Sequence, residues 1–315
     1  KSPKPIFYDH YVTFLRKTNS RDFSDMLIDT QKISVDPKYK DFFDGMYDYI
    51  FIDEYQDTST LQMKILSAIN AKQYYIIGDK NQSIYGFSGA NCSKIESILK
   101  EKKTVVEFNL TKNFRSHINI VNNANKYSSL EAIPESDNEG FVDDRFINKT
   151  KLFKMMKDGK PITVLVRTNK VIKEIEKNCL KKRIPMKYFN YLTKTDVTNL
   201  VKSDITDSLR KKVREVLPYY GNDLSELLSF IEENEESKVF VTSIHKSKGR
   251  EFPRCVVVNS SDPEMLVEYG SMTHDLETYS FITDDGIVIE ESRNVHYVAV
   301  TRPKEELYFM IYDDV

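Results

Sequence analysis

Residues 49–54, Tyr-Ile-Phe-Ile-Asp-Glu, place a continuous apolar run directly before two acidic side chains. A short apolar run of this kind predicts a β-strand that is buried on both faces, as in a parallel sheet. The same design recurs at residues 74–77 and 104–108. Helical stretches separate the runs, at residues 61–69 and 93–99. Strands that alternate with helices favour an α/β fold with a parallel sheet.

A second α/β series follows a loop-like stretch at residues 133–140, whose Pro, Ser, Asp, Asn and Gly content predicts a linker. The predicted strands of this series are residues 162–166, 239–243, 255–258 and 307–312. Residues 190–238 are charged and mostly helical, which indicates a surface insertion. Residues 281–289 carry Asp-Asp-Gly at their middle, which predicts a hairpin.

The composition is typical of a soluble globular protein, because 40% of the 315 residues are hydrophobic and 30% are charged. The sequence holds no run of about eighteen or more apolar residues, so we expect no membrane-spanning helix. A formal net charge of −2 does not by itself indicate a nucleic-acid-binding protein, although it is compatible with a local basic groove. The odd number and wide spacing of Cys92, Cys179 and Cys255 fit neither a disulfide framework nor a zinc cluster. They favour a reducing intracellular compartment, in the cytoplasm or at the nucleoid.

Asp53 and Glu54 have two interpretations. Ligands of open parallel sheets bind beyond the carboxyl ends of the strands, where these acids lie, and one carboxylate could hold Mg²⁺ while the other activates a water. Acids also end strands simply because loops are exposed to water. The dipeptide alone favours the second interpretation, so its surroundings decide.

Five longer segments follow one another along the chain. They are residues 50–58 (IFIDEYQDT), 78–90 (GDKNQSIYGFSGA), 110–116 (LTKNFRS), 242–252 (TSIHKSKGREF) and 290–302 (EESRNVHYVAVTR). In this order they resemble motifs II to VI of the UvrD-like (UvrD/Rep/PcrA) DNA helicases of superfamily 1, over roughly residues 22 to 310. The resemblance implies two RecA-like lobes with parallel sheets, the P-loop NTPase helicase fold. It also implies an ATP-dependent DNA helicase or translocase of DNA repair or replication.

The resemblance implies ATP and Mg²⁺ as cofactors and assigns a role to each residue that would act on them. Asp53 would coordinate Mg²⁺ through water, and Glu54 would activate the attacking water. Gln82 would sense the γ-phosphate. Arg115 and Arg302 would supply guanidinium groups to the charge that develops during phosphoryl transfer, a task that suits a permanently charged fork of donors. For either arginine alone, a surface salt bridge is the simpler interpretation.

Four further residues match the family's nucleotide contacts. Phe114 stands where the family stacks a ring on adenine, although an isolated phenylalanine is more often a core residue. Glu251 matches the residue that meets the ribose. Lys248 and Gly249 match the tight turn before it.

Single-stranded DNA is the partner that the resemblance implies, with movement in the 3′ to 5′ sense. Phe87 matches the main position at which a ring stacks on unpaired bases, with Tyr85 beside it, and stacking of this kind is independent of sequence. Arg167 and Asn169 match residues that contact the strand. His245 lies where the nucleotide and DNA functions meet, although a histidine satisfied at a strand end is the alternative.

The chain departs from the family in its phosphate-binding loop, because no Gly-x-x-x-x-Gly-Lys-Ser/Thr occurs in it. We expect that part N-terminal to Lys1, so that this chain is a C-terminal fragment with an incomplete first lobe and little ATPase activity of its own. Ser88 replaces the usual arginine, and Arg250 the usual leucine. The predicted domains are a helical remnant (1–47), the C-terminal part of the first lobe (48–135) and the second lobe (136–315), with a short insertion at about 190–238.

Two other functions compete with the motor. A helicase-like chain without ATPase activity could serve as a DNA-binding or partner-docking module, and its single-strand binding would depend on salt but not on nucleotide. A Mg²⁺ nuclease that uses Asp53 and Glu54 is weaker, because no further acidic cluster for a second metal is evident.

Overall fold

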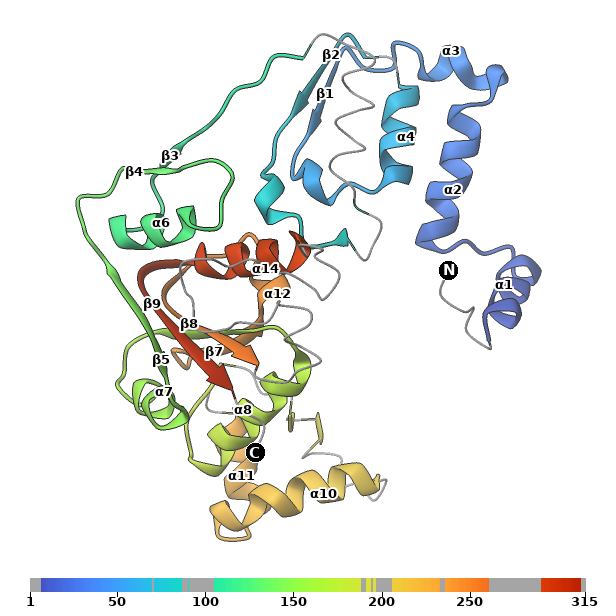
Figure 1. Cartoon of the computed structure of the whole chain (residues 1–315). Helices are drawn as coiled ribbons and strands as arrows, with labels where there is room; N and C mark the ends of the chain where they lie inside the picture. The colour runs from blue at the N-terminus through green and yellow to red at the C-terminus, as the bar shows by residue number, and fades with distance from the viewer. Residues whose placement is uncertain are drawn as a thin grey trace, which may run out of the picture. The chain divides into compact units, whose positions relative to one another are not determined.

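The computed structural model describes residues 7–69, 71–86, 90, 105–187, 191–193, 195–196, 206–232, 236–260 and 290–312 (Figure 1). It has the expected α/β fold with parallel sheets. The chain divides into two compact units, Lys1–Phe108 and Asn109–Val315. Residues 109–135, which the sequence analysis grouped with the first lobe, therefore pack with the second unit. Two hydrogen bonds show why, because the Ser116 hydroxyl donates to the Pro303 carbonyl (2.7 Å) and the His117 amide donates to the Lys304 carbonyl (2.9 Å).

The first unit is built on two parallel strands, β1 (Tyr49–Ile52) and β2 (Gln73–Ile76). Helix α4 (Thr60–Ala68) follows β1, and a small core forms from Ile52, Tyr55 and Met63. The other described helices of this unit are α1 (Tyr8–Lys17), α2 (Phe23–Ser34) and α3 (Lys40–Phe43), with 3-10 turns η1 (Pro37–Tyr39), η2 (Tyr55–Asp57) and η3 (Lys80–Gln82).

The opposite face of the β1–β2 pair is exposed. Tyr49 is 58% and Phe51 is 69% accessible, and the Phe51 ring stacks on Tyr75 with 4.7 Å between centroids. The prediction of a strand buried on both faces is therefore wrong for β1, because core residues cover only the face that carries Ile52. The strand predicted at residues 104–108 is also not formed over its described part: residues 105–108 carry no strand, and Phe108 is 82% accessible.

The second unit contains a five-stranded, all-parallel sheet in the order β5-β9-β8-β6-β7. Its strands are β5 (Phe141–Ile147), β6 (Ile162–Val166), β7 (Val239–Ser243), β8 (Phe252–Ser260) and β9 (Pro303–Tyr312). A short parallel pair, β3 (Lys112–Asn113) and β4 (Ile133–Pro134), lies in the stretch before it. The stretch predicted as a linker is thus partly paired, and β5 was not predicted.

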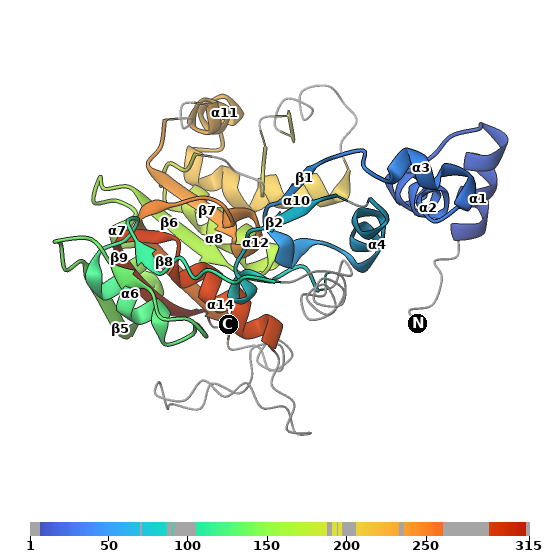
Figure 2. The same cartoon turned by 90° about the horizontal axis from the view of Figure 1, so that it is seen from above.

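Helices cover both faces of this sheet. The described ones are α6 (Ile118–Asn125), α7 (Lys149–Met155), α8 (Asn169–Lys181), α10 (Asp207–Val216), α11 (Leu224–Glu232), α12 (Ile244–Ser247) and α14 (Glu290–Val300), with the turn η5 (Leu217–Tyr220). Figure 2 shows α8 and α14 on opposite sides of the strands. Right-handed crossovers that leave a central strand in opposite directions produce this arrangement.

The core of the second unit is large and continuous. The strand predicted at residues 162–166 is present as β6, and all five of its residues are buried, as expected for a central strand of a parallel sheet. Val213, Val216, Tyr220 and Leu227 belong to the same core. They come from the region predicted as a surface insertion, so its described part is not a surface appendage but an integral layer of the unit.

Several sequence predictions fall outside the described residues: the helix at 93–99, the hairpin at 281–289, the stacking residue Phe87, and the positions Ser88 and Cys92. Cys179 and Cys255 are both free and buried, and burial raises the pKa of each thiol. Among the described residues, no helix is both long enough and apolar enough to cross a membrane.

Candidate functional site

The two acids of the first unit lie at the carboxyl end of β1, as predicted. Both side chains are exposed, and the Glu54 amide donates a hydrogen bond of 2.8 Å to Asp53 Oδ1. Glu54 adopts a left-handed backbone conformation, with φ +48°. This conformation is strained for a residue with a Cβ, and it ends the strand abruptly and turns the chain into η2.

Gln56 connects the ends of the two strands. Its side chain is fully buried; Nε2 donates to Glu54 Oε2 at 2.5 Å, and Oε1 accepts the Asp79 amide at 3.1 Å. Gly78 is required between them, because a Cβ there would overlap Gln56 Oε1 and the Tyr55 ring. A buried amide with both ends bonded fixes the carboxylate of Glu54 relative to the end of β2.

Gln82 belongs to the same network. Its Nε2 donates to Asp79 Oδ2 at 2.9 Å, and Asp79 Oδ1 accepts the amide of Asn81 at 2.9 Å. Glu54, Gln56, Asp79 and Gln82 thus form one chain of contacts across the carboxyl ends of β1 and β2. Tyr85 follows at the end of this segment, and the pKa of its hydroxyl is raised by burial and by the charge of Asp57.

The acids can be tested as a Mg²⁺ site from the donors they present. Asp53 offers an exposed carboxylate with Glu54 next to it, and among the described residues no three His, Cys, Asp or Glu side chains gather into a metal-binding group. Mg²⁺ is usually held by one or two carboxylates, with water and substrate phosphates completing its octahedron. The residues fit that kind of site and not a cage made by protein alone.

In the second unit, Arg115 and Glu251 form an ion pair. Arg115 Nε lies 3.1 Å from Glu251 Oε2, and Lys304 Nζ lies 2.8 Å from Glu251 Oε1. All three side chains are partly exposed, so each pair adds little to stability. Lys304 and Arg115 hold the pKa of the Glu251 carboxyl below its usual range. The two residues predicted to contact phosphate and ribose therefore contact each other in this structure.

Arg302 is buried and fully engaged. Its side chain is 1% accessible; Nε donates to the Val298 carbonyl (2.9 Å), Nη1 to the Arg250 carbonyl (3.2 Å) and Nη2 to the Thr301 hydroxyl (2.8 Å). In this conformation the guanidinium joins α14 to the segment before β8. It would have to leave these partners to reach a phosphate.

The remaining nucleotide residues lie around the same end of the unit. Phe114 is 78% accessible and is not a core residue, so its ring is open to a stacking partner. Lys248 ends α12, and Gly249 has φ +75°, a conformation that glycine adopts without strain. The predicted tight turn before Glu251 is therefore present.

The predicted DNA residues of this unit lie at the other end of the strands. Arg167 directly follows β6, and its Nη1 lies 3.0 Å from His245 Nε2 in α12, after β7. Asn169 is exposed at the start of α8. The adjacent, parallel strands β6 and β7 bring Arg167 and His245 together, because Val166 lies opposite Ser243.

The strand register separates the two groups. Glu251 and Arg302 come immediately before β8 and β9, whose first residues Phe252 and Pro303 are opposite one another. Arg167 and His245 follow the last residues of β6 and β7. In an all-parallel sheet the first group therefore lies at the amino ends of the strands and the second group at their carboxyl ends. Six residues of strand place these two ends roughly 20 Å apart.

No role was predicted for Gln56, Asp79 or Lys304. For Gln56 and Asp79 a signal existed, since both follow apolar strands whose carboxyl ends share an edge. For Lys304 there was none, because its contact with Glu251 joins residues 53 positions apart in the sequence.

Two family models match the chain. The model for the UvrD/REP helicase N-terminal domain matches residues 3–105, and the model for the UvrD-like helicase C-terminal domain matches residues 197–314. The chain belongs to the UvrD-like helicases, with the α/β fold of that family.

The chain is also similar to curated members of the family. The ATP-dependent DNA helicase Rep of Buchnera aphidicola subsp. Acyrthosiphon pisum is 27% identical over 236 residues, which are 71% of this chain and 35% of the relative. The ATP-dependent DNA helicase PcrA of Staphylococcus epidermidis is 28% identical over 206 residues, 56% of this chain and 27% of the relative. The chain spans about a third of the length of the curated relatives that it matches.

Proposed function

We propose that this chain forms part of an ATP-dependent DNA helicase or translocase that moves on single-stranded DNA in the 3′ to 5′ sense. The observation that carries the proposal is the contact chain from Glu54 through Gln56 and Asp79 to Gln82 at the carboxyl ends of β1 and β2. A carboxylate held by a buried amide, with a second amide beside it, is suited to orient a water and to respond to a phosphate.

Each predicted nucleotide residue then has a role in the proposed hydrolysis of ATP. Asp53 would hold Mg²⁺, which would neutralise phosphate charge, and Glu54 would take the proton of the attacking water. Gln82 transmits the presence of the γ-phosphate through Asp79. When nucleotide arrives, Arg115 leaves Glu251 for a phosphate, and Glu251, kept ionised by Lys304, accepts a ribose hydroxyl.

At the carboxyl ends of β6 and β7, Arg167 donates a hydrogen bond to a DNA phosphate. His245, which contacts Arg167, connects this DNA contact to the segment that ends at Glu251. Two ligands bound at opposite ends of one rigid sheet can be coupled through α12, which directly follows β7. We also propose an intracellular location in a reducing compartment, in keeping with the two buried free thiols.

The test is steady-state ATP hydrolysis, with and without single-stranded DNA, in the natural polypeptide that carries this sequence. Glu54→Gln should lower DNA-stimulated turnover on the order of 100-fold or more, because it removes the base and keeps the hydrogen bond with Gln56. Asp41→Asn, an exposed acid in α3, is the matched control and should leave turnover unchanged. Equal rates for Glu54→Gln and the parent would refute the motor.

A second candidate is a helicase-like DNA-binding module without ATPase activity. The observation that favours it is the absence of a Gly-x-x-x-x-Gly-Lys-Ser/Thr sequence from these 315 residues. This module predicts single-strand binding that weakens with salt and does not change when ATP and Mg²⁺ are added. A nucleotide-dependent change in affinity would exclude it.

A further inference from the structure

One cluster of charges in the second unit is assembled from three separate segments. Glu251, directly before β8, contacts Arg115 through Oε2 (3.1 Å to Nε) and Lys304 of β9 through Oε1 (2.8 Å to Nζ). Glu251 is 136 residues from Arg115 and 53 residues from Lys304. Because Phe252 lies opposite Pro303, the strand register places Glu251 and Lys304 at the same ends of β8 and β9. The fold, and not neighbouring sequence, therefore brings these side chains together.

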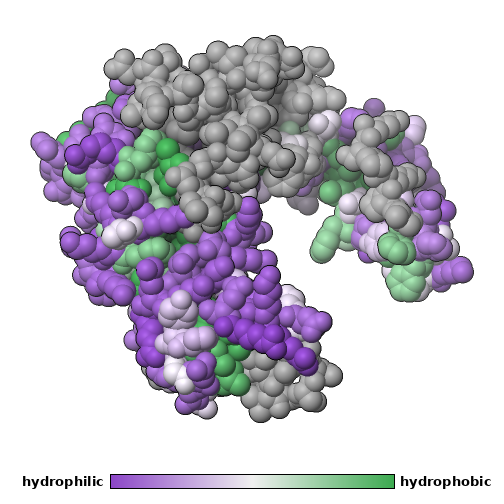
Figure 3. Space-filling view, turned by 60° about the horizontal axis from the view of Figure 1, so that its bottom comes forward, coloured by the Kyte–Doolittle hydropathy of each residue, from purple (hydrophilic) through white to green (hydrophobic). Residues whose placement is uncertain are grey.

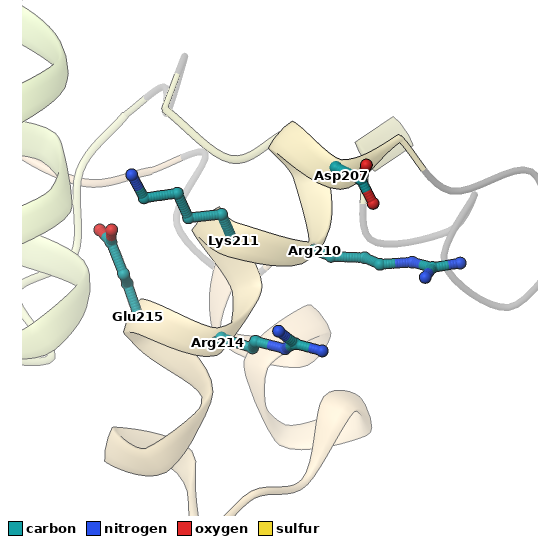
Figure 4. A pocket seen from close by; sticks show the side chains of 5 residues that line it. All are labelled: Asp207, Arg210, Lys211, Arg214 and Glu215. Atoms are coloured by element: carbon teal, nitrogen blue, oxygen red, sulfur yellow. The ribbon is translucent and has the colours of Figure 1, made fainter.

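The cations of α10 show the opposite case. Arg210, Lys211 and Arg214 come from one helix, and with Asp207 and Glu215 they line an open depression of about 570 Å³ (Figure 4). The Arg210 and Arg214 side chains extend in the same direction, away from Lys211 and Glu215. Figure 3 brings this end of the second unit forward and shows mostly hydrophilic residues on it. A solvated helix face explains charges of that kind, but it does not explain a carboxylate that binds cations from two other segments.

The backbone around Glu251, Arg115 and Lys304 is held independently of their side chains. The Ser116 hydroxyl donates to the Pro303 carbonyl at 2.7 Å, and the His117 amide donates to the Lys304 carbonyl at 2.9 Å. These bonds fix the segment after Arg115 to the start of β9. The Arg115 side chain can therefore change its partner without displacement of the strand that carries Lys304.

The two ion pairs are of the kind that exchanges easily. The side chains of Arg115, Glu251 and Lys304 are 39%, 46% and 39% accessible, and ion pairs at such positions contribute little to stability. Within the described part of the chain, the Arg115 side chain uses only Nε in a contact. A single hydroxyl that donates to Glu251 Oε2 can take the place of that bond, because a carboxylate oxygen accepts from either donor.

Lys304 supplies what this exchange requires. Its hydrogen bond is the largest of the causes that hold the pKa of the Glu251 carboxyl below its ordinary value, and Arg115 adds to the effect. Glu251 therefore stays ionised when Arg115 is withdrawn, and Oε1 keeps its partner while Oε2 becomes available. A pair of one acid and one arginine would lack this property, because withdrawal of the arginine would leave the acid without a counter-ion.

We propose that Lys304 is a positioning residue that makes the phosphate contact of Arg115 depend on a hydroxyl of the nucleotide's ribose. The inference rests on the proposed function and deepens it, because it names the residue that couples recognition of the sugar to release of the arginine. Glu251 Oε2 accepts the ribose hydroxyl in place of Arg115, and Lys304 keeps Oε1. Arg115 is then released to the phosphates. With a triphosphate that lacks the hydroxyl, Arg115 stays on Glu251, and the loss falls on turnover more than on binding.

The first experiment tests the contact in the full chain without nucleotide. The chain is labelled with carbon-13 at Cδ of glutamate, and the Glu251 resonance is assigned by its loss in Glu251→Gln. The titration midpoint of Glu251 should lie below the ordinary value for glutamate. Lys304→Gln should raise it, because the largest cause of the low pKa is removed, and Lys304→Arg should restore it. Lys154→Gln, at an exposed lysine of α7, should leave it unchanged. A midpoint that does not move in Lys304→Gln overturns the inference.

The second experiment compares hydrolysis of ATP and of 2′,3′-dideoxy-ATP, with Mg²⁺ and single-stranded DNA, in the natural polypeptide that carries this sequence. For the parent, kcat should be about tenfold lower with the dideoxy nucleotide, and KM should change less, because a hydrogen bond to a charged group is lost together with the release of Arg115. Lys304→Gln should lower kcat for ATP several-fold and leave kcat for the dideoxy nucleotide unchanged, so that the two rates approach one another. Lys304→Arg and Lys154→Gln should keep the preference of the parent.

These comparisons distinguish the possible failures. A parent that does not hydrolyse ATP refutes the motor, and the inference falls with it. A parent that hydrolyses both nucleotides with the same kcat overturns the inference alone. Lys304→Gln also overturns it if both rates fall equally, because that is the result expected of a contact with a merely structural role.

Discussion

The two units differ in how completely their strands are covered. In the second unit every residue of β6 is buried, between β8 and β7 and under helices on both faces. In the first unit only one side of the β1–β2 pair packs against a core, and Phe51 and Tyr49 remain accessible on the other. Both begin from similar apolar runs in the sequence. The difference teaches that two similar apolar runs can both form strands, whereas burial of the second face of each strand depends on what else packs there.

The comparison predicts a large loss of stability from a single truncation in β6. Leu165 is fully buried, so Leu165→Ala should lower the free energy of unfolding by about 3 kcal/mol through lost transfer energy and the cavity left behind. Denaturant titration followed by far-ultraviolet circular dichroism measures it. Leu130→Ala, at an exposed position of the same unit, should cost far less. Equal effects would mean that the core of the second unit is not close-packed.

A smaller loss of stability is expected from breaking the ion pair between Arg254 and Asp158, at the amino ends of the strands of the same sheet. Arg254 is buried, and its Nη1 and Nη2 lie 2.6 and 2.8 Å from the two oxygens of Asp158. Asp158→Asn keeps an acceptor but leaves the guanidinium without its counter-charge, so we expect a loss of about 2 kcal/mol at neutral pH.

The pH dependence of this loss follows from the pKa of Asp158. Hydrogen bonds from Arg254 lower that pKa from 3.8 to about 2 in the folded chain. The unfolded chain therefore takes up the proton first as the pH falls. The contribution of the pair is complete above about pH 4 and is lost toward pH 2. The difference between parent and Asp158→Asn should narrow over this range; a difference that stays constant would contradict the pairing.

The smallest effect is expected on the open face of the first unit. Phe51→Ser should change the free energy of unfolding by less than about 1 kcal/mol, because the ring is exposed and loses mainly its stacking on Tyr75. Phe153→Ser, at a buried position of the second unit, is the matched substitution and should cost several-fold more. If Phe51→Ser proved as damaging as Phe153→Ser, the comparison between the units would fail.

Local pattern predicted the position of Asp53 and Glu54 at the end of a strand. Asp53 and Glu54 lie at a strand end because the short apolar run before them forms β1, and the polar residues after it face water. The turn at Gly249 was implied by the family resemblance, and its positive φ is a conformation that glycine adopts without strain. The region 190–238 was misjudged because its charges lie on outer faces, while Val213, Val216 and Leu227 between them pack inward.

The environment of the arginines could not be predicted. Arg115 and Arg302 have the same chemistry and the same expected role, yet one lies in an exposed ion pair with Glu251 and the other is buried with every nitrogen bonded. The contacts that distinguish the two arginines join distant segments, because Glu251 lies 136 residues from Arg115 and Arg250 lies 52 residues from Arg302.

The sequence by itself determined the class of fold and the order of the motifs, and it predicted which residues would act on a nucleotide, since strand and turn preferences are local and motif chemistry depends on residue type. Only the tertiary structure decided that Gln56 links Glu54 to Asp79 and that Glu251 forms an ion pair with Arg115. It also decided that Arg167 and Glu251 lie at opposite ends of the strands of one sheet. These are contacts between distant segments, and they are fixed by strand order and register, which a linear pattern does not encode.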